Sequence, residues 1–70
     1  MNKNIARTEY AVEVNNKKGF VRQIEIFQTY EEAENFVKIT DEELNEDEYF
    51  NIIFIDYDKD ENEIDFGTVL

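Results

Sequence analysis

Residues 48–58 read EYFNIIFIDYD, and this stretch decides how the rest of the chain folds. Seven of its eleven residues are aromatic or isoleucine, and carboxylates close both ends. Successive side chains of a strand point to opposite faces of a sheet. One face would then consist of Phe50, Ile52 and Phe54, and the other of Tyr49, Ile53, Ile55 and Tyr57. Two apolar faces are typical of a strand inside a sheet, so we expect neighbours on both sides.

Two alternating stretches, 7–14 and 20–27, surround the turn sequence NNKKG and predict a β-hairpin. Apolar and polar side chains alternate along both stretches, as in half-buried strands. Cross-strand pairs stabilise a hairpin when their apolar faces coincide. The register that satisfies this condition pairs Val14 with Phe20, Tyr10 with Ile24 and Val12 with Arg22.

The sequence TYEE at 29–32 is a capping box and predicts that a helix begins there. Residues spaced three, three and one apart form its apolar stripe. These residues are Tyr30, Ala33, Phe36 and Val37. The helix should end near Lys38 or Ile39. The sequence TDEE at 40–43 repeats the pattern, which is compatible with a short second helical turn near 41–45.

A polar turn at 58–63 and a last strand at 64–70 complete the order ββαββ. We predict a single α+β domain over 1–70, with a four-stranded antiparallel sheet in the order 2-1-3-4. One helix covers one face of this sheet, through a crossover of the usual right-handed kind. The other face is left open and would carry Val21, Phe27, Ile53 and Ile55.

The chain lacks several residues that carry chemistry in other proteins. It contains no His, Cys or Ser, which excludes the common nucleophilic arrangements and the usual zinc ligands. We therefore predict a protein that is not an enzyme and has no cofactor. No stretch approaches the ~20 apolar residues of a membrane span, and the first residues lack the apolar run of a signal peptide. A cytoplasmic protein without a membrane partner is expected.

Negative charge is concentrated in one part of the chain. Residues 1–30 carry five bases and three acids (5 − 3 = +2), whereas residues 31–65 carry two bases and fifteen acids (2 − 15 = −13). A compact chain of this length would be ~28 Å across. Duplex DNA of that length carries roughly 16 charges, so the two charges are of the same order. Such a surface would attract a basic nucleic-acid-binding groove and repel nucleic acid itself.

The acids at 56, 58 and 60 resemble the opening of a calcium loop. The later positions do not fit, because the sixth is Glu61 rather than glycine and the twelfth is Gly67 rather than glutamate. We predict a solvated hairpin turn and no metal site, with a weak cation-binding hairpin at 56–63 as the alternative.

In size, acidity, lack of cysteine and compact α+β pattern, the chain resembles the small acidic inhibitors of phages and mobile elements, including anti-CRISPR and anti-restriction DNA mimics. This resemblance implies a non-enzymatic inhibitor that occupies the nucleic-acid channel of a basic protein, such as a CRISPR or restriction nuclease. From the residues themselves, we expect the contact to combine acids with apolar anchors. The acids are Glu31, Glu32, Glu34, Asp41, Glu42, Glu43, Glu46, Asp47, Glu48, Asp56, Asp58, Asp60, Glu61 and Glu63, and the anchors are Tyr49, Ile53, Ile55 and Tyr57.

A structural or assembly module is the alternative. An apolar sheet face without a covering helix also suits a homodimer. The target and the oligomeric state stay open at this point.

Overall fold

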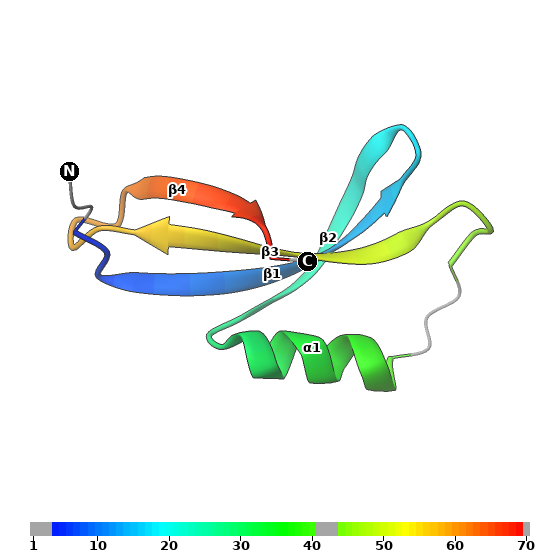
Figure 1. The fold of residues 1–70 in the computed structure, drawn as a ribbon, viewed down its shortest axis with the longest axis horizontal. Coiled ribbons are helices and arrows are strands. Elements are labelled where there is room, and N and C mark those ends of the chain that lie inside the picture. The colour runs from blue at the N-terminus through cyan, green and yellow to red at the C-terminus, as the bar shows by residue number, and fades with distance from the viewer. Residues whose placement is uncertain (1–3, 41–43, 70) are drawn as a thin grey trace.

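The computed structural model describes residues 4–40 and 44–69, which form four strands and one helix. The elements are β1 (Arg7–Asn16), β2 (Gly19–Phe27), α1 (Tyr30–Ile39), β3 (Tyr49–Tyr57) and β4 (Glu63–Thr68). All neighbouring strands are antiparallel, in the order β2-β1-β3-β4 (Figure 1). The predicted α+β fold and strand order are confirmed.

The core lies between α1 and the sheet. Val12, Ala33 and Ile52 are almost fully buried there, and each comes from a different element. The predicted apolar stripe of α1 packs on this cluster, together with Tyr10, Ile24, Phe27 and Phe50. Burial of this apolar surface is the main stabilisation available to a chain with no cysteine and so no disulfide.

Thr29 begins α1 as predicted. Its hydroxyl accepts a hydrogen bond from the backbone N–H of Glu32 at 3.1 Å. Only this half of the capping box is formed among the described residues. The second predicted helical turn falls largely on residues 41–43, which lie outside the described residues, and residues 44–45 are not helical.

The predicted register of the β1–β2 hairpin is wrong. Tyr10 pairs with Phe27 rather than Ile24, and Val14 pairs with Arg22 rather than Phe20. The register shifts twice, between Val12 and Glu13 and between Val14 and Asn15. Each shift leaves one extra residue in β2, which is the arrangement of a β-bulge.

These bulges change which side chains reach the core. Ile24 and Phe27 are three residues apart and would face opposite sides of a regular strand, yet both pack on the core. Phe27 contacts Phe36 of α1 with ring centroids 5.4 Å apart. The expectation that Phe27 lies on the open face is therefore wrong. Ile26 takes a place there instead, because it pairs with Ala11.

The molecule is elongated, with extents of 41 × 25 × 18 Å and a radius of gyration of 13.2 Å. The tip of the β1–β2 hairpin points away from the β3–β4 pair (Figure 1). The β3–β4 turn lies at one end of the long axis and the 44–48 segment at the other (Figure 1). Among the described residues, no helix has the length and apolar character needed to cross a membrane.

Candidate partner-binding surface

The acids of α1 form the first acidic group. Glu31 and Glu32 are exposed in its first turn, where carboxylates suit the positive end of the helix dipole. Glu34 is half-buried and accepts a long hydrogen bond of 3.5 Å from the Tyr30 hydroxyl. Desolvation, with a smaller effect of the Glu34 charge, raises the pKa of Tyr30. The helix thus presents two exposed carboxylates and one that is partly engaged.

The segment between α1 and β3 carries the second group. Glu46 and Asp47 are exposed in a turn. Glu48 differs, because its side chain is only 8% exposed and accepts from the Asn45 N–H at 3.0 Å. The guanidinium of Arg22 lies 3.9 Å from the Glu48 carboxylate. This ion pair explains why β2 carries a base in its middle. The predicted contacts Asp41, Glu42 and Glu43 lie outside the described residues.

The β3–β4 turn carries the third group, and Asp58 organises it. One oxygen of Asp58, Oδ1, accepts from the backbone N–H groups of Asp60 and Asn62 at 2.8 and 2.9 Å. Hydrogen bonding from the Asn62 backbone is the main cause that lowers the pKa of Asp58, and the Asp60 bond acts in the same direction. Asp60, Glu61 and Glu63 are exposed. Asp60 and Glu63 are therefore presented to a partner, Glu61 is exposed but paired with Arg7, and Asp58 holds the turn.

Asp56 does not lie on the surface. It is 8% exposed, and its Oδ1 accepts a hydrogen bond of 2.6 Å from the Thr8 hydroxyl. Its cross-strand partner on β4 is Asp65. Asp56 is buried because it follows Ile52 and Phe54 at even positions, on the helix side of β3. Over residues 4–40 and 44–69, no three acids converge on a point that could hold a metal ion.

Arg7 ties the third group to β1. Its guanidinium lies 3.0 Å from Glu61, 3.5 Å from Glu9 and 4.1 Å from the centre of the Tyr57 ring. The pKa of Tyr57 is raised, mainly by desolvation and next by the charge and hydrogen bond of Glu9. Tyr57 is half-buried under Arg7, so the structure presents less of this predicted anchor than of Tyr49, which is 52% exposed.

We call the sheet face opposite α1 the open face. Ile53 and Ile55 lie on it as expected, both half-buried. The residues beside them were not predicted as site residues: Ile26, which is 43% exposed, and Phe66, which is 64% exposed. Cross-strand pairing joins Ile26, Ala11 and Ile53, and also Ile55 and Phe66. Because Ile53 and Ile55 are neighbours on one face of β3, these five residues form one apolar strip. Phe66 could have been found from the alternation of the last strand, but Ile26 could not, because a bulge places it there.

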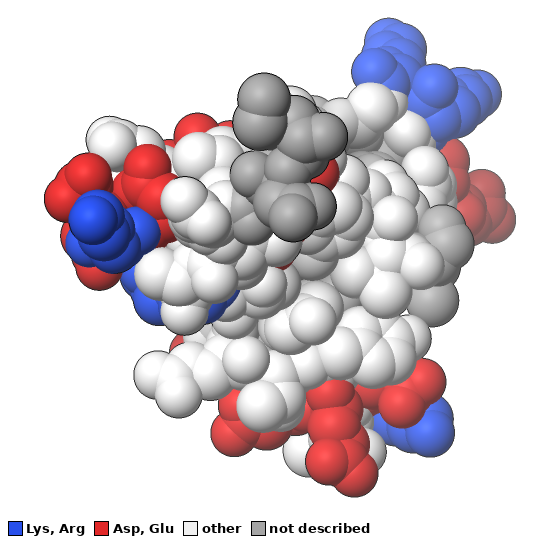
Figure 2. Space-filling view, turned by 60° about the vertical axis from the view of Figure 1, so that its left-hand side comes forward, with Lys and Arg blue, Asp and Glu red and all other residues white. Residues whose placement is uncertain are grey.

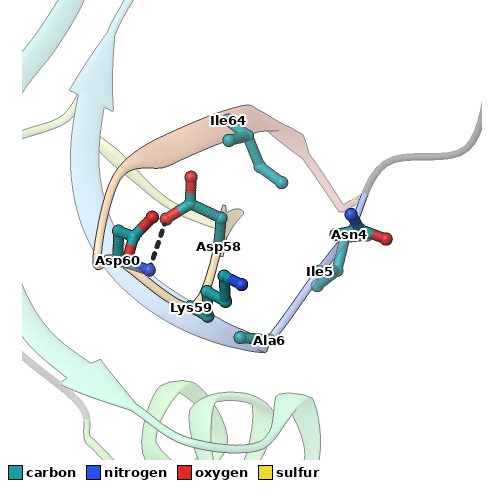
Figure 3. Close-up of a pocket in the computed structure, with 7 residues that line it drawn as sticks. All are labelled: Asn4, Ile5, Ala6, Asp58, Lys59, Asp60 and Ile64. Atoms are coloured by element: carbon teal, nitrogen blue, oxygen red, sulfur yellow. Dashed lines mark hydrogen bonds between the residues drawn. The ribbon is translucent and has the colours of Figure 1, made fainter.

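A cleft lies between the N-terminal segment and the β3–β4 turn (Figure 3). Ile5, Ala6 and Ile64 give it apolar walls, and Asp58, Lys59 and Asp60 give it charges of both signs. The dashed bond in Figure 3 is the one from Asp60 to Asp58, so this carboxylate already serves the turn.

The three acidic groups do not converge on one patch. Two lie at opposite ends of the 41 Å axis and the third lies along α1 (Figure 1). Figure 2 shows one face of the molecule on which uncharged residues fill the centre and charged ones stand at the margins. A scan against protein-family models and searches among curated proteins and solved structures give no match.

Proposed function

We propose that this chain is a non-enzymatic acidic binding protein that occupies a basic, nucleic-acid-binding surface of another protein. A nuclease of the CRISPR or restriction type is the kind of target that this chemistry suits. The observation that carries the proposal is the placement of exposed carboxylates on α1 and at both ends of a 41 Å molecule. An extended acidic surface fits a long basic groove better than a small basic pocket.

The elongated shape makes the likeness to DNA looser than a compact chain would. A net charge of −11 over 41 Å corresponds to one charge per about 4 Å, against ~1.7 Å in duplex DNA. The acids also form three separate groups rather than two continuous rows. We therefore infer that the target recognises the overall field and selected contacts rather than a copy of the phosphate backbone.

Capture from a lysate with the tagged chain as bait tests the proposal. We expect the captured protein to be basic, to be released by duplex DNA, and to bind about tenfold or more weakly when salt rises from about 50 to about 200 mM. The test variant changes five exposed acids to amides: Glu31, Glu32, Glu46, Asp47 and Asp60. The control variant changes Lys17 and Lys18, at the β1–β2 turn, to glutamine. Equal affinity at low and high salt, or full binding by the five-acid variant, would contradict the proposal.

A homodimer is the second candidate, favoured by the exposure of Phe66 and Ile26 on one sheet face. Such a dimer would survive neutralisation of the five acids and dissociate when Phe66 is changed to glutamate. Light scattering at micromolar concentration measures it. A monomeric wild-type chain at that concentration rules it out.

A further inference from the structure

The open face places two carboxylates directly beside the apolar strip. Glu9 and Glu13 lie on β1, two residues to either side of Ala11, and so point to the same face. Glu9 pairs with Ile55 and Glu13 with Asn51 across β1 and β3. Ala11 is fully buried in the centre of the strip, although it faces away from α1. The face is therefore a packed apolar surface with an acid at each end of its central strand.

Both carboxylates are partly withdrawn from water. Glu9 and Glu13 are half-buried, and burial raises the pKa of Glu13 even though a hydrogen bond with Asn51 acts against this effect. Arg7, at 3.5 Å from Glu9, is the base that contacts this acid within the described chain. A group that covers the strip would remove more water from both acids. Its own charge then decides whether covering is favourable.

We propose that the open face receives a basic amphipathic helix of the partner protein. Its apolar side chains would cover the strip, and one lysine or arginine would face each of Glu9 and Glu13. Four residues of strand separate these acids by ~13 Å. A helix rises ~1.5 Å per residue, so ~13 Å corresponds to about nine residues. Seven or eight residues, or ~10.5–12 Å, is the nearest spacing that keeps both cations on one side of the helix, and a flexible lysine side chain spans the difference. The inference rests on the proposed function and names the face and the segment that it would use.

Two other occupants fit less well. A purely apolar segment would remove more water from both acids and supply no charge of its own, which is costly above all for Glu13, since Arg7 already contacts Glu9. A second copy would bring a second Glu9 and Glu13 and a further net charge of −11 to the same interface. A cationic segment removes both costs, which is charge complementarity in its simplest form.

Binding of synthetic peptides to the full chain tests this inference. The probe is a helical peptide of Leu, Ala and Lys, with leucines on one face and lysines seven residues apart beside them. A scrambled peptide of the same composition is its control. We expect backbone NMR shifts to cluster on the strip, and Ile26→Thr, Phe66→Ser and Glu13→Gln each to weaken binding about tenfold. Ile39→Thr on α1 and Glu25→Gln, which pairs with Val12, should leave it unchanged.

Three outcomes would each overturn the inference in a different way, and a fourth would separate it from the proposed function. Equal binding of the scrambled peptide would show attraction by charge alone. Binding that survives the strip variants but is lost in the five-acid variant would place the contact on the acidic groups and leave the proposed function standing. Shifts of strip resonances with protein concentration alone would make a second copy the occupant. If the strip variants lose peptide binding, the inference holds. If capture from lysate is at the same time independent of salt, the proposed function fails, so the two can be told apart.

Discussion

At the scale of single residues, the hydrogen bond between Thr8 and Asp56 matters because it serves a buried carboxylate. The carboxylate is 8% exposed and the hydroxyl donates to it at 2.6 Å. Thr8→Val keeps the side-chain shape and leaves the buried acid without this donor. We expect a loss of about 1–3 kcal/mol in the free energy of unfolding, measured by urea titration. Thr68→Val, at an exposed position, is the control and should change stability by less than about 0.5 kcal/mol.

Asp58 gives a pH dependence with a defined sign. Backbone hydrogen bonds lower its pKa in the folded state below the ordinary value of 3.8. The ionised carboxylate therefore stabilises the fold fully above 3.8, and this contribution is lost as pH falls through the lowered pKa. Asp58→Asn should be less stable than wild type at neutral pH, with the difference shrinking below about pH 4. A constant difference in urea midpoint across this range contradicts the prediction.

Glu13 should act in the opposite direction. Burial raises its pKa above the ordinary value of 4.5, so its ionised form destabilises the fold. This cost is present above the raised pKa and disappears as pH falls towards 4.5. Glu13→Gln should therefore be at least as stable as wild type at neutral pH and lose this advantage on acidification. Urea midpoints of the two proteins between about pH 4 and about pH 7 provide the comparison, and a parallel pair of curves argues against it.

Asp56 also shows what could be read from the sequence at this scale. The charge pattern predicts a surface position for Asp56, because this residue begins an acidic run. Its position, two residues after Phe54 and four after Ile52, already placed it on the helix side of β3. Alternation was therefore the better guide than charge. The burial of Glu48 could not be predicted from the sequence. Glu48 is paired with Arg22, and a bulge in β2 sets the position of Arg22.

At the scale of elements, α1 and β3 were predictable and the β1–β2 register was not. The capping box and the 3-3-1 spacing of apolar residues act within a few residues of sequence, so they survive in the fold. The register depends on where extra residues enter β2. No glycine or proline marks a bulge in 20–27, and regular alternation therefore gave the wrong partner for Tyr10. The bulges are stabilised by the core, since they let Ile24 and Phe27 both reach it.

The start of α1 can be tested by removing its cap. Thr29→Ala eliminates the acceptor for the Glu32 N–H and should cost about 1 kcal/mol. For a chain of this size, such a loss lowers the midpoint of thermal unfolding by about 4–8 °C. Thr29→Ser keeps the hydroxyl and is the control. If the alanine and serine variants melt together, the cap does not contribute as described.

At the scale of the whole molecule, the strand order could be predicted and the shape could not. The order 2-1-3-4 follows from two hairpins and one crossover. The long axis runs along β3, from the β3–β4 turn to the 44–48 segment, and the β1–β2 hairpin, with its two bulges, diverges from it. Elongation matters for function, because it moves the acidic groups apart. It also leaves the apolar strip of the open face between them as a separate element of any interface.

The net charge of −11 gives the last prediction, on the molecule as a whole. Self-repulsion of like charges destabilises a compact state, and salt screens it. The Debye length falls from ~30 Å at 0.01 M salt to ~3 Å at 1 M. The second value is far below the 41 Å length of the molecule, so repulsion across it is then screened. The midpoint of thermal unfolding should therefore rise by several degrees over this range. A variant with Glu46, Asp47 and Asp60 changed to amides should begin at a higher midpoint and rise less, because it has less repulsion to screen. A midpoint that falls with salt would mean that the attractive pairs of Arg7 outweigh the repulsion.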